Sequence, residues 1–292
     1  MKIFCASCGI KENNDEDIKL KMCNACKSVR YCSVKCQKEH WPKHKKSCKK
    51  RAAELRDELL FKQPESNHLG DCPICFLPLP IEDEGSEIFC CCCNYACYGC
   101  VYVYSKLGGE ASSKCPFCRK SAYLSDEQIT ANLEKRAEAN DPTAIYELGK
   151  ICYEKGDFRG AFKLISRSAK LGCAAAPFDL GLMYRDGHGV EKDEKKMVRS
   201  LEDAAISGHP KARLALSEIE FSRNRIERCM KHLIIGSKLG DALAVEALQV
   251  FYEEGGMSKE EFDAAISGHQ AALEAMKSKD REKAATEKWG EK

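Results

Sequence analysis

Cysteine is concentrated in closely spaced pairs near the start of the chain, and such pairs are suited to holding a metal ion. Seventeen of the 20 cysteines lie at or before Cys118. A Cys-x-x-Cys turn brings two sulfur atoms close together, and Zn²⁺ takes four such ligands at the corners of a tetrahedron. Two pairs therefore make one site, and the ligands in this chain predict four zinc sites.

The cysteines between residues 72 and 118 form three complete Cys-x-x-Cys pairs and one run of four. The pairs are Cys72 with Cys75, Cys97 with Cys100, and Cys115 with Cys118. The run, residues 90–93, has to supply the fourth pair. Alternation along a strand places Cys90 and Cys92 on one face and Cys91 and Cys93 on the other. We therefore predict Cys90 and Cys92 as ligands, with Cys91 or Cys93 as the alternatives.

A similar set of ligands, which includes one histidine, lies between residues 5 and 48. Two Cys-x-x-Cys pairs are followed by four residues at near-helical spacing: Cys5, Cys8, Cys23, Cys26, Cys32, Cys36, His44 and Cys48. Side chains four residues apart share one face of a helix, so each later pair can reach one metal. A segment this short has too few aliphatic residues for a core, and bound zinc decides whether it folds.

Residues 5–48 resemble a MYND finger, with Gln37 and Trp41 at the positions typical of that family. The resemblance implies two interleaved ligand sets, in which one zinc ion takes Cys5, Cys8, Cys32 and Cys36 and the other takes Cys23, Cys26, His44 and Cys48. It also implies the capture of short proline-containing peptides. We expect Trp41 to pack between the two metals.

Residues 71–120 resemble an all-cysteine RING finger. This resemblance implies that one zinc ion takes Cys72, Cys75, Cys97 and Cys100 and the other takes Cys90, Cys92, Cys115 and Cys118. RING fingers bind a ubiquitin-conjugating enzyme and hold its ubiquitin thioester ready for attack, which is a positioning effect. We therefore expect no catalytic side chain in this chain.

The same resemblance implies a contact surface for the conjugating enzyme. Ile74 and Pro116 would line an apolar groove between the two zinc loops. Arg119 would hydrogen-bond both partners through its planar guanidinium. Many active RING fingers place a tryptophan on the helix after the third pair; this chain has none there, and one of residues 101–103 is expected to serve instead.

Length and composition narrow the class of protein. The chain has 292 residues, enough for two or three domains. It begins MKIFCASCGI, without the apolar core of a signal peptide, and no apolar run approaches the ~18 residues that span a bilayer. These features favour reduced, metal-binding thiols in the cytosol or nucleus over disulfides. Fifteen ionised thiols and four zinc ions change the formal net charge from +2 to −5, which gives no support to nucleic-acid binding.

The segments around the two fingers predict helices and linkers. Residues 49–70 predict a helical extension that ends in a linker, and the basic run at residues 43–51 is interpreted as a solvated helix face. Residues 121–141 predict a connecting helix, started by a Ser-x-x-Gln capping box at Ser125.

Residues 142–276 repeat a helical pattern. Ala-x-x-x-Leu recurs at intervals of 32, 36 and 32 residues, at Ala144, Ala176, Ala212 and Ala244. A period in the mid-thirties indicates antiparallel helix pairs stacked as a solenoid, with recurring glycines at the end of each second helix. The best copy, which contains GLMYRDGHGVEKD, resembles the Sel-one-like repeat, a family whose solenoids bind protein segments. Residues 277–292 are predicted to be a frayed, charged tail.

The remaining histidines and cysteines of the repeats are given no role in a site. We expect surface positions for His188, His209 and His269, and small core positions for Cys152, Cys173 and Cys229.

These patterns together predict a mostly α-helical protein with small zinc-stabilised modules, in which two cross-brace zinc fingers precede an α-solenoid. They indicate a RING-type ubiquitin ligase that recruits a conjugating enzyme through the RING and selects protein partners through the MYND finger and the repeats. A non-enzymatic interaction adaptor is the alternative. The lysine methyltransferase activity found with many MYND fingers is disfavoured, because the chain has no room for a SET domain.

Overall fold

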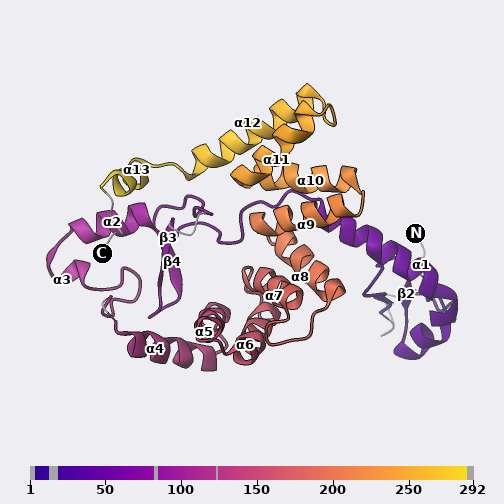
Figure 1. Ribbon diagram of the computed structural model, residues 1–292. Coiled ribbons are helices and arrows are strands. Elements are labelled where there is room, and N and C mark those ends of the chain that lie inside the picture. Colours follow the sequence, from indigo (N-terminus) through magenta and orange to yellow (C-terminus); the bar gives the residue numbers. More distant parts are fainter. Residues whose placement is uncertain (1–3, 13–18, 82–84, 123, 288–292) are drawn as a thin grey trace. The chain divides into compact units, whose positions relative to one another are not determined.

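The protein is described by a computed structural model that covers residues 4–12, 19–81, 85–122 and 124–287 (Figure 1). It is mostly helical, as predicted. The chain divides into two compact units, the first ending at Lys62 and the second beginning at Gln63.

The first unit is built on one long helix. Strands β1 (Lys21–Met22) and β2 (Arg30–Tyr31) pair in antiparallel fashion, and α1 (Val34–Leu60) follows them. The hydroxyl of Ser33 accepts a hydrogen bond from the backbone N–H of Cys36 and so caps α1. The helix extends well beyond the metal-ligating segment, as its sequence predicted.

The core of the first unit consists mainly of cysteine side chains, packed with Leu20 and Tyr31. We expected Trp41 in this core, but 40% of its surface is exposed. Its ring meets His44 edge-on, with the ring centroids 6.3 Å apart. The expectation is wrong because the candidate ligands already fill the interior, which leaves Trp41 at its edge.

The second unit begins with a small module, residues 71–120, which we call the second zinc module. Strands β3 (Ser86–Phe89) and β4 (Asn94–Cys97) form an antiparallel hairpin, and α2 (Tyr98–Lys106) and the short α3 (Gly109–Ser112) follow. Buried cysteines make up half of this core, and apolar side chains such as Leu79 make up the rest.

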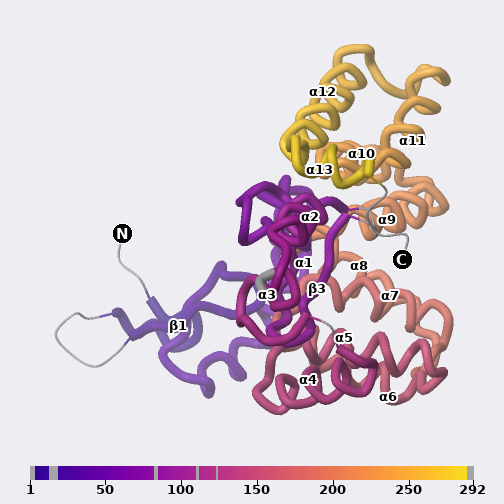
Figure 2. The backbone as a smooth tube through the Cα atoms, turned by 90° about the vertical axis from the view of Figure 1, so that its left-hand side faces the viewer, coloured from indigo at the N-terminus to yellow at the C-terminus, as the bar shows by residue number. Residues whose placement is uncertain are grey.

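Helix α4 (Asp126–Glu138) leads from the second zinc module to the repeats and starts at the capping box of Ser125 and Gln128, as predicted. The repeat helices then form antiparallel pairs, seen in two views in Figure 1 and Figure 2. The pairs are α5 (Pro142–Glu154) with α6 (Phe158–Lys170), α7 (Ala176–Asp186) with α8 (Glu194–Ile206), α9 (Pro210–Ser222) with α10 (Ile226–Ser237), and α11 (Ala242–Glu253) with α12 (Lys259–Met276).

The alanines and glycines that recur in the sequence have the same structural roles in successive repeats. The four alanines of the Ala-x-x-x-Leu pattern, one near the start of each first helix, are completely or almost completely buried. Gly172, Gly208 and Gly240 follow the second helices, with φ of +95°, +82° and +97°. These left-handed conformations are accessible to glycine without strain, so the glycines let the chain reverse into the next pair.

The final helix was not predicted. Residues 279–286, expected to belong to a frayed tail, form α13 (Lys279–Thr286), which packs against α2. The ion pair between Lys106 and Glu287, 3.0 Å long, joins residues 181 positions apart. The helix was missed because its docking partner is remote in sequence and its own composition is polar.

The second zinc module packs on the repeats at both ends and in the middle. At one end the turn of the β3–β4 hairpin places Cys93 against Leu133 and Ala144. In the middle the linker just before the module makes the contact, where the backbone N–H of His68 donates to the carbonyl of Gly208 at 3.2 Å. At the other end α13 covers α2. The module and the repeats therefore form one compact unit.

Candidate metal centres

The cysteines and one histidine of the two modules come together in four clusters. Within each cluster the four possible ligand atoms lie within 4.8 Å of one another. The clusters are Cys5/Cys8/Cys32/Cys36, Cys23/Cys26/His44/Cys48, Cys72/Cys75/Cys97/Cys100 and Cys91/Cys92/Cys115/Cys118. Both modules are thus interleaved, with each cluster drawing on two separate stretches of chain.

All the Cys-x-x-Cys pairs except Cys97 with Cys100, which begins α2, share one backbone turn. After the second cysteine, Lys27, Phe76 and Arg119 have φ of +54°, +58° and +60°. The N–H of each donates back to the carbonyl of the first cysteine of its pair, as Phe76 does to Cys72 at 2.8 Å. This tight turn aims both sulfurs to the same side, and it explains why the pair spacing predicted metal binding.

The distances between ligand atoms fit zinc. Four sulfurs at Zn–S bonds of about 2.3 Å stand about 3.8 Å apart at the corners of a tetrahedron. The sulfur of Cys75 is 3.8 Å from that of Cys97, and the sulfur of Cys92 is 3.7 Å from that of Cys115. Four soft ligands, most of them buried, leave no open coordination position, so these centres suit structural Zn²⁺ rather than metal-based catalysis.

The fourth cluster corrects one predicted ligand. Cys91, and not Cys90, joins the cluster, and its sulfur lies 3.3 Å from that of Cys118. The prediction assumed a strand through this run, but β3 ends at Phe89 and the next four residues form a turn before β4. Alternation therefore does not apply, and Cys90 packs with α4 and α5 instead. Cys92 is in the cluster, as predicted.

His44 is oriented for coordination through one ring nitrogen. Its Nε2 is 3.3 Å from the sulfur of Cys26, and its Nδ1 is 3.4 Å from the hydroxyl of Ser47. The hydroxyl of Ser47 also donates to the carbonyl of His44 at 2.9 Å. A partner at the second ring nitrogen fixes the ring plane, which a histidine ligand requires.

Crowding of the thiols spreads their pKa values. Burial, with help from the thiol of Cys23, raises the pKa of Cys48 to about 12. In Cys23 burial is outweighed by hydrogen bonds from the backbone N–H of Cys26 and from His44, so the pKa falls to about 6. Backbone hydrogen bonds similarly overcome burial in Cys72 and lower its pKa to about 7. Most thiols therefore lose a proton when Zn²⁺ binds, and zinc affinity falls as the pH falls.

The residues expected to meet a conjugating enzyme lie on the two zinc loops of the second zinc module. Ile74 is 40% exposed, Pro116 is partly exposed and Arg119 is exposed. The residues expected to replace the missing tryptophan differ in position. Val101 and Tyr102 are each 7% exposed and therefore buried, while Val103 is 41% exposed. Of these three, Val103 alone has the exposure that a contact residue needs.

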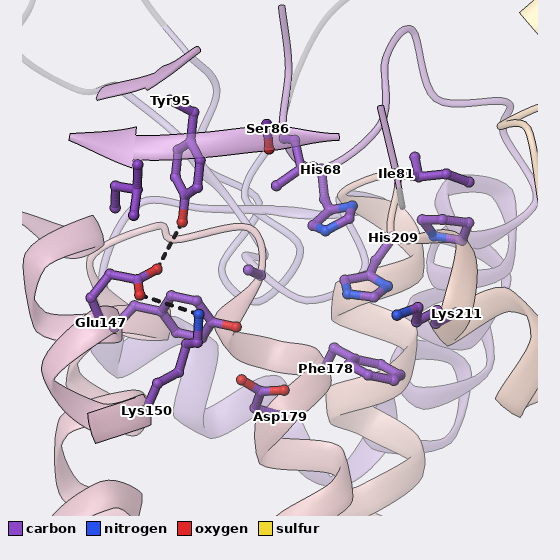
Figure 3. A pocket seen from close by; sticks show the side chains of 15 residues that line it. His68, Ile81, Ser86, Tyr95, Glu147, Lys150, Phe178, Asp179, His209 and Lys211 are labelled. Atoms are coloured by element: carbon purple, nitrogen blue, oxygen red, sulfur yellow. Dashed lines mark hydrogen bonds and ion pairs between the residues drawn. The ribbon is translucent and has the colours of Figure 1, made fainter. Parts of the chain in front are cut away.

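A polar cavity of about 320 Å³ lies between the second zinc module and the repeats (Figure 3). Tyr95 of β4 donates to the carboxylate of Glu147 at 2.7 Å, and Lys150 pairs with the same carboxylate at 3.2 Å. Asp179, one repeat after Glu147, has its pKa raised by burial. No local pattern marked these residues, because Tyr95 and Glu147 belong to different modules and meet only after folding.

Two histidines on the other side of this cavity stack on each other, His209 buried and His68 partly buried (Figure 3). His209, expected on the surface, is only 6% exposed, because the linker before the second zinc module covers it. Its ring stacks on those of His68 and Phe178, with centroid distances of 3.9 and 4.3 Å. Cys229 is buried in the repeat core, as predicted.

In the part of the chain that the structure describes, none of the helices has both the length and the apolar character needed to cross a bilayer.

Comparison with known proteins identifies the first module. Residues 5–48 match the family model of the MYND finger. SET domain and MYND-type zinc finger protein 6 of Schizosaccharomyces pombe is 39% identical over 56 residues, 19% of this chain and 11% of that protein. Human histone-lysine N-methyltransferase SMYD3 is 55% identical over 31 residues, 11% of this chain and 7% of that protein.

Other similarities reach beyond the finger. Putative beta-lactamase HcpC of Helicobacter pylori is 39% identical over 56 residues, 19% of each chain. This chain therefore spans less than a fifth of the length of each of these three relatives. A Sel1 repeat protein from Oxalobacter formigenes superposes with a TM-score of 0.42 at 21% identity, over 61% of this chain and 70% of that one. The Escherichia coli antigen c5321, with an SLR fold, gives a TM-score of 0.41 at 24% identity, over 67% of this chain and 40% of that one.

Proposed function

We propose that this protein is a RING-type ubiquitin ligase in which the second zinc module binds a ubiquitin-conjugating enzyme, while the MYND finger and the helical repeats select protein partners. The observation that carries the proposal is the exposed apolar surface on the first zinc loop. Ile74 is 40% exposed and Phe76 is 76% exposed. Apolar side chains held in water by a rigid turn are typical of a surface that contacts another protein.

Arg119 supports the proposal from the second zinc loop. Its backbone is fixed by the left-handed turn after Cys118 and by the hydrogen bond from its N–H to the carbonyl of Cys115, 3.0 Å long. The exposed guanidinium is therefore attached to a fixed backbone, which lowers the conformational entropy that is lost when it bridges two partners. The chain would add no covalent chemistry of its own and would act by orienting the thioester.

The MYND finger offers a candidate surface for a peptide partner. Trp41 is 40% exposed and Val34 is 67% exposed, both on α1 beside the metal clusters. The two side chains lie two turns apart on α1, and the exposed indole suits stacking on proline rings. Methyl transfer, the activity in the name of SMYD3, is not part of the proposal, because that match spans only 31 residues.

The test is ubiquitin transfer with purified components and a panel of conjugating enzymes. Wild-type protein is expected to stimulate chain formation, and Ile74→Ala and Arg119→Ala are expected to reduce it at least tenfold with zinc content unchanged. Ile10→Ala is the matched control, because it removes a 44% exposed isoleucine from the other unit. Zinc-loaded wild-type protein that is inert with every enzyme of the panel would contradict the proposal.

An adaptor without ligase activity is the second candidate. It is favoured by the burial of Val101 and Tyr102, because the first two of the three residues considered for the tryptophan position cannot meet a partner. In that case partner binding depends on the finger and the repeats and is unaffected by Ile74→Ala. A pull-down of the conjugating enzyme by wild type and Ile74→Ala distinguishes the two candidates, because only the ligase binds that enzyme through Ile74.

A further inference from the structure

Arg281, on the last helix, reaches the zinc loop of the cluster formed by Cys72, Cys75, Cys97 and Cys100. Its Nη2 lies 3.6 Å from the sulfur of Cys75 and 3.4 Å from the carbonyl oxygen of Leu77. Its Nη1 donates to the carbonyl oxygens of Pro78, at 2.8 Å, and Met276, at 2.5 Å. A single guanidinium thus ties the zinc loop to the end of the last repeat helix.

The positive charge of the Arg281 guanidinium attracts the negative charge of the thiolate ligands. The guanidinium of Arg281 contacts the sulfur of Cys75, which is a thiolate when it binds zinc. A guanidinium that donates to a ligating thiolate spreads the negative charge of the sulfur and holds it in the position that the metal needs. Loss of such a hydrogen-bond partner of a metal ligand typically costs 10- to 100-fold in metal affinity.

A glycine on α2 makes the close approach of α13 possible. Gly99 lies between the ligands Cys97 and Cys100, and a Cβ at this position would stand 2.6 Å from the backbone nitrogen of Arg281 and 2.9 Å from its Cα. These are backbone atoms, which cannot rotate away. Any larger residue at position 99 therefore displaces α13.

Helix α13 also packs on α2, but Arg281 makes its hydrogen bonds to the zinc loop. Of its eight residues only Ala284 is buried. The ion pair of Lys106 with Glu287 has side chains 58% and 49% exposed, and such pairs contribute little. The hydrogen bonds of Arg281 therefore link docking to the zinc loop, and the position of that loop depends on its two cysteine ligands.

We propose that Arg281 is a positioning residue for the zinc ion of the Cys72/Cys75/Cys97/Cys100 cluster, and that α13 stays docked only while this zinc ion is bound. Zinc binding and helix docking are linked equilibria. The factor by which bound zinc raises the docking equilibrium constant of α13 is therefore the factor by which docked α13 raises the affinity for zinc. The C-terminal helix is then a latch that joins the last repeat to the second zinc module and responds to the metal. This proposal does not rest on ubiquitin ligase activity.

The first test measures zinc release from the full-length, zinc-loaded protein with a chromogenic chelator. Arg281→Ala is expected to speed the release of one of the four zinc equivalents by 10- to 100-fold and to leave the other three unchanged. Arg281→Lys keeps the charge without the planar fork and is expected to fall between. Lys283→Ala, an exposed cation on the same helix, is the matched control and is expected to behave as wild type. Equal release from Arg281→Ala and wild type would overturn the proposal.

The second test assigns the released ion. Cys75→Ser removes a ligand of this cluster, so adding Arg281→Ala to it is expected to cause no further change in zinc release. Gly99→Ala keeps the arginine in the sequence but prevents α13 from docking, so it is expected to match Arg281→Ala. In a chain ending at Lys277, Gly99→Ala is expected to have no effect. A persisting effect of Gly99→Ala there would show that position 99 acts on the ligands directly, and it would contradict the latch.

The reverse direction is tested by limited trypsin digestion. Lys277 and Lys279 border the start of α13 and are cleavage sites. Cleavage there is expected to be slow in the zinc-loaded protein and at least tenfold faster in Cys75→Ser. Equally slow cleavage in both proteins would mean that the helix does not respond to this zinc ion and would overturn the second half of the proposal.

Discussion

The buried pair of His68 and His209 predicts that the second unit loses stability in mild acid. Burial, with a contribution from nearby Lys211, lowers the pKa of His68 to about 4. Burial, with contributions from His68 and Lys211, lowers the pKa of His209 to about 2. Neither Nδ1 has a hydrogen-bond partner among the described residues. The folded protein therefore keeps both imidazoles neutral, whereas the unfolded chain protonates them below about pH 6.5.

The size of the effect follows from proton linkage. Because the unfolded state binds more protons in acid, the free energy of unfolding falls as the pH falls from about 6.5 toward the folded-state pKa. Above about pH 6.5 the two histidines cause no such loss. For His209 alone, a shift from about 6.5 to about 2 costs about 0.8 kcal/mol at pH 6 and about 2 kcal/mol at pH 5. His68 adds a similar amount, reduced by its coupling to His209.

The assay is urea unfolding followed by helical circular dichroism at pH 7.5, 6 and 5, on wild type and His209→Phe. Phenylalanine keeps the stack on Phe178 without titrating, and the adjoining cavity of about 320 Å³ gives its larger ring room. Zinc loss in acid affects both proteins alike and cancels in the comparison. His188→Phe is the matched control, since His188 also stacks on a phenylalanine, with centroids 4.4 Å apart, but remains partly exposed.

Between pH 7.5 and 5 the free energy of unfolding of His209→Phe is expected to fall by about 2 kcal/mol less than that of wild type. That of His188→Phe is expected to fall as in wild type. An equal loss in wild type and His209→Phe would refute the reasoning, because it would mean that the buried imidazole is not held neutral.

Three further predictions concern ligands, backbone and the polar cavity. Native mass spectrometry is expected to find about four zinc ions in Cys90→Ser but only three in Cys91→Ser; the reverse would restore the strand-based assignment. Gly208→Ala is expected to destabilise the second unit by at least about 2 kcal/mol more than Gly156→Ala in thermal melts. Both glycines have φ near +80°, but only at position 208 does a Cβ meet a backbone oxygen, at 2.3 Å. Tyr95→Phe leaves a buried glutamate without one of its hydrogen bonds and is expected to cost about 1–2 kcal/mol in urea unfolding; no measurable loss would mean that water replaces the hydroxyl.

The metal ligands could be predicted from their spacing almost completely, with the single exception of Cys90, while the interleaving of the pairs was implied by the family resemblances. Each Cys-x-x-Cys turn is a local structure whose geometry is set within five residues, and the helical spacing of His44 and Cys48 is equally local. The run at residues 90–93 failed because its conformation depends on where the hairpin turns. Four consecutive cysteines carry no signal that separates a turn from a strand.

The sequence by itself determined the pairs of metal ligands and the helix caps, since each is set by residues close together along the chain, and the period of the repeats, which recurs along it. Only the tertiary structure decided that His209 is buried, that Tyr95 meets Glu147 and that α13 docks on α2. Those contacts join segments remote from one another in sequence, and they form because the second zinc module and the repeats cover each other's surfaces. The sequence of a polar helix such as α13 does not show whether it lies in water or packs on another element. Here it packs because Gly99 leaves space for it on α2 and because carbonyl groups of a zinc loop accept hydrogen bonds from Arg281.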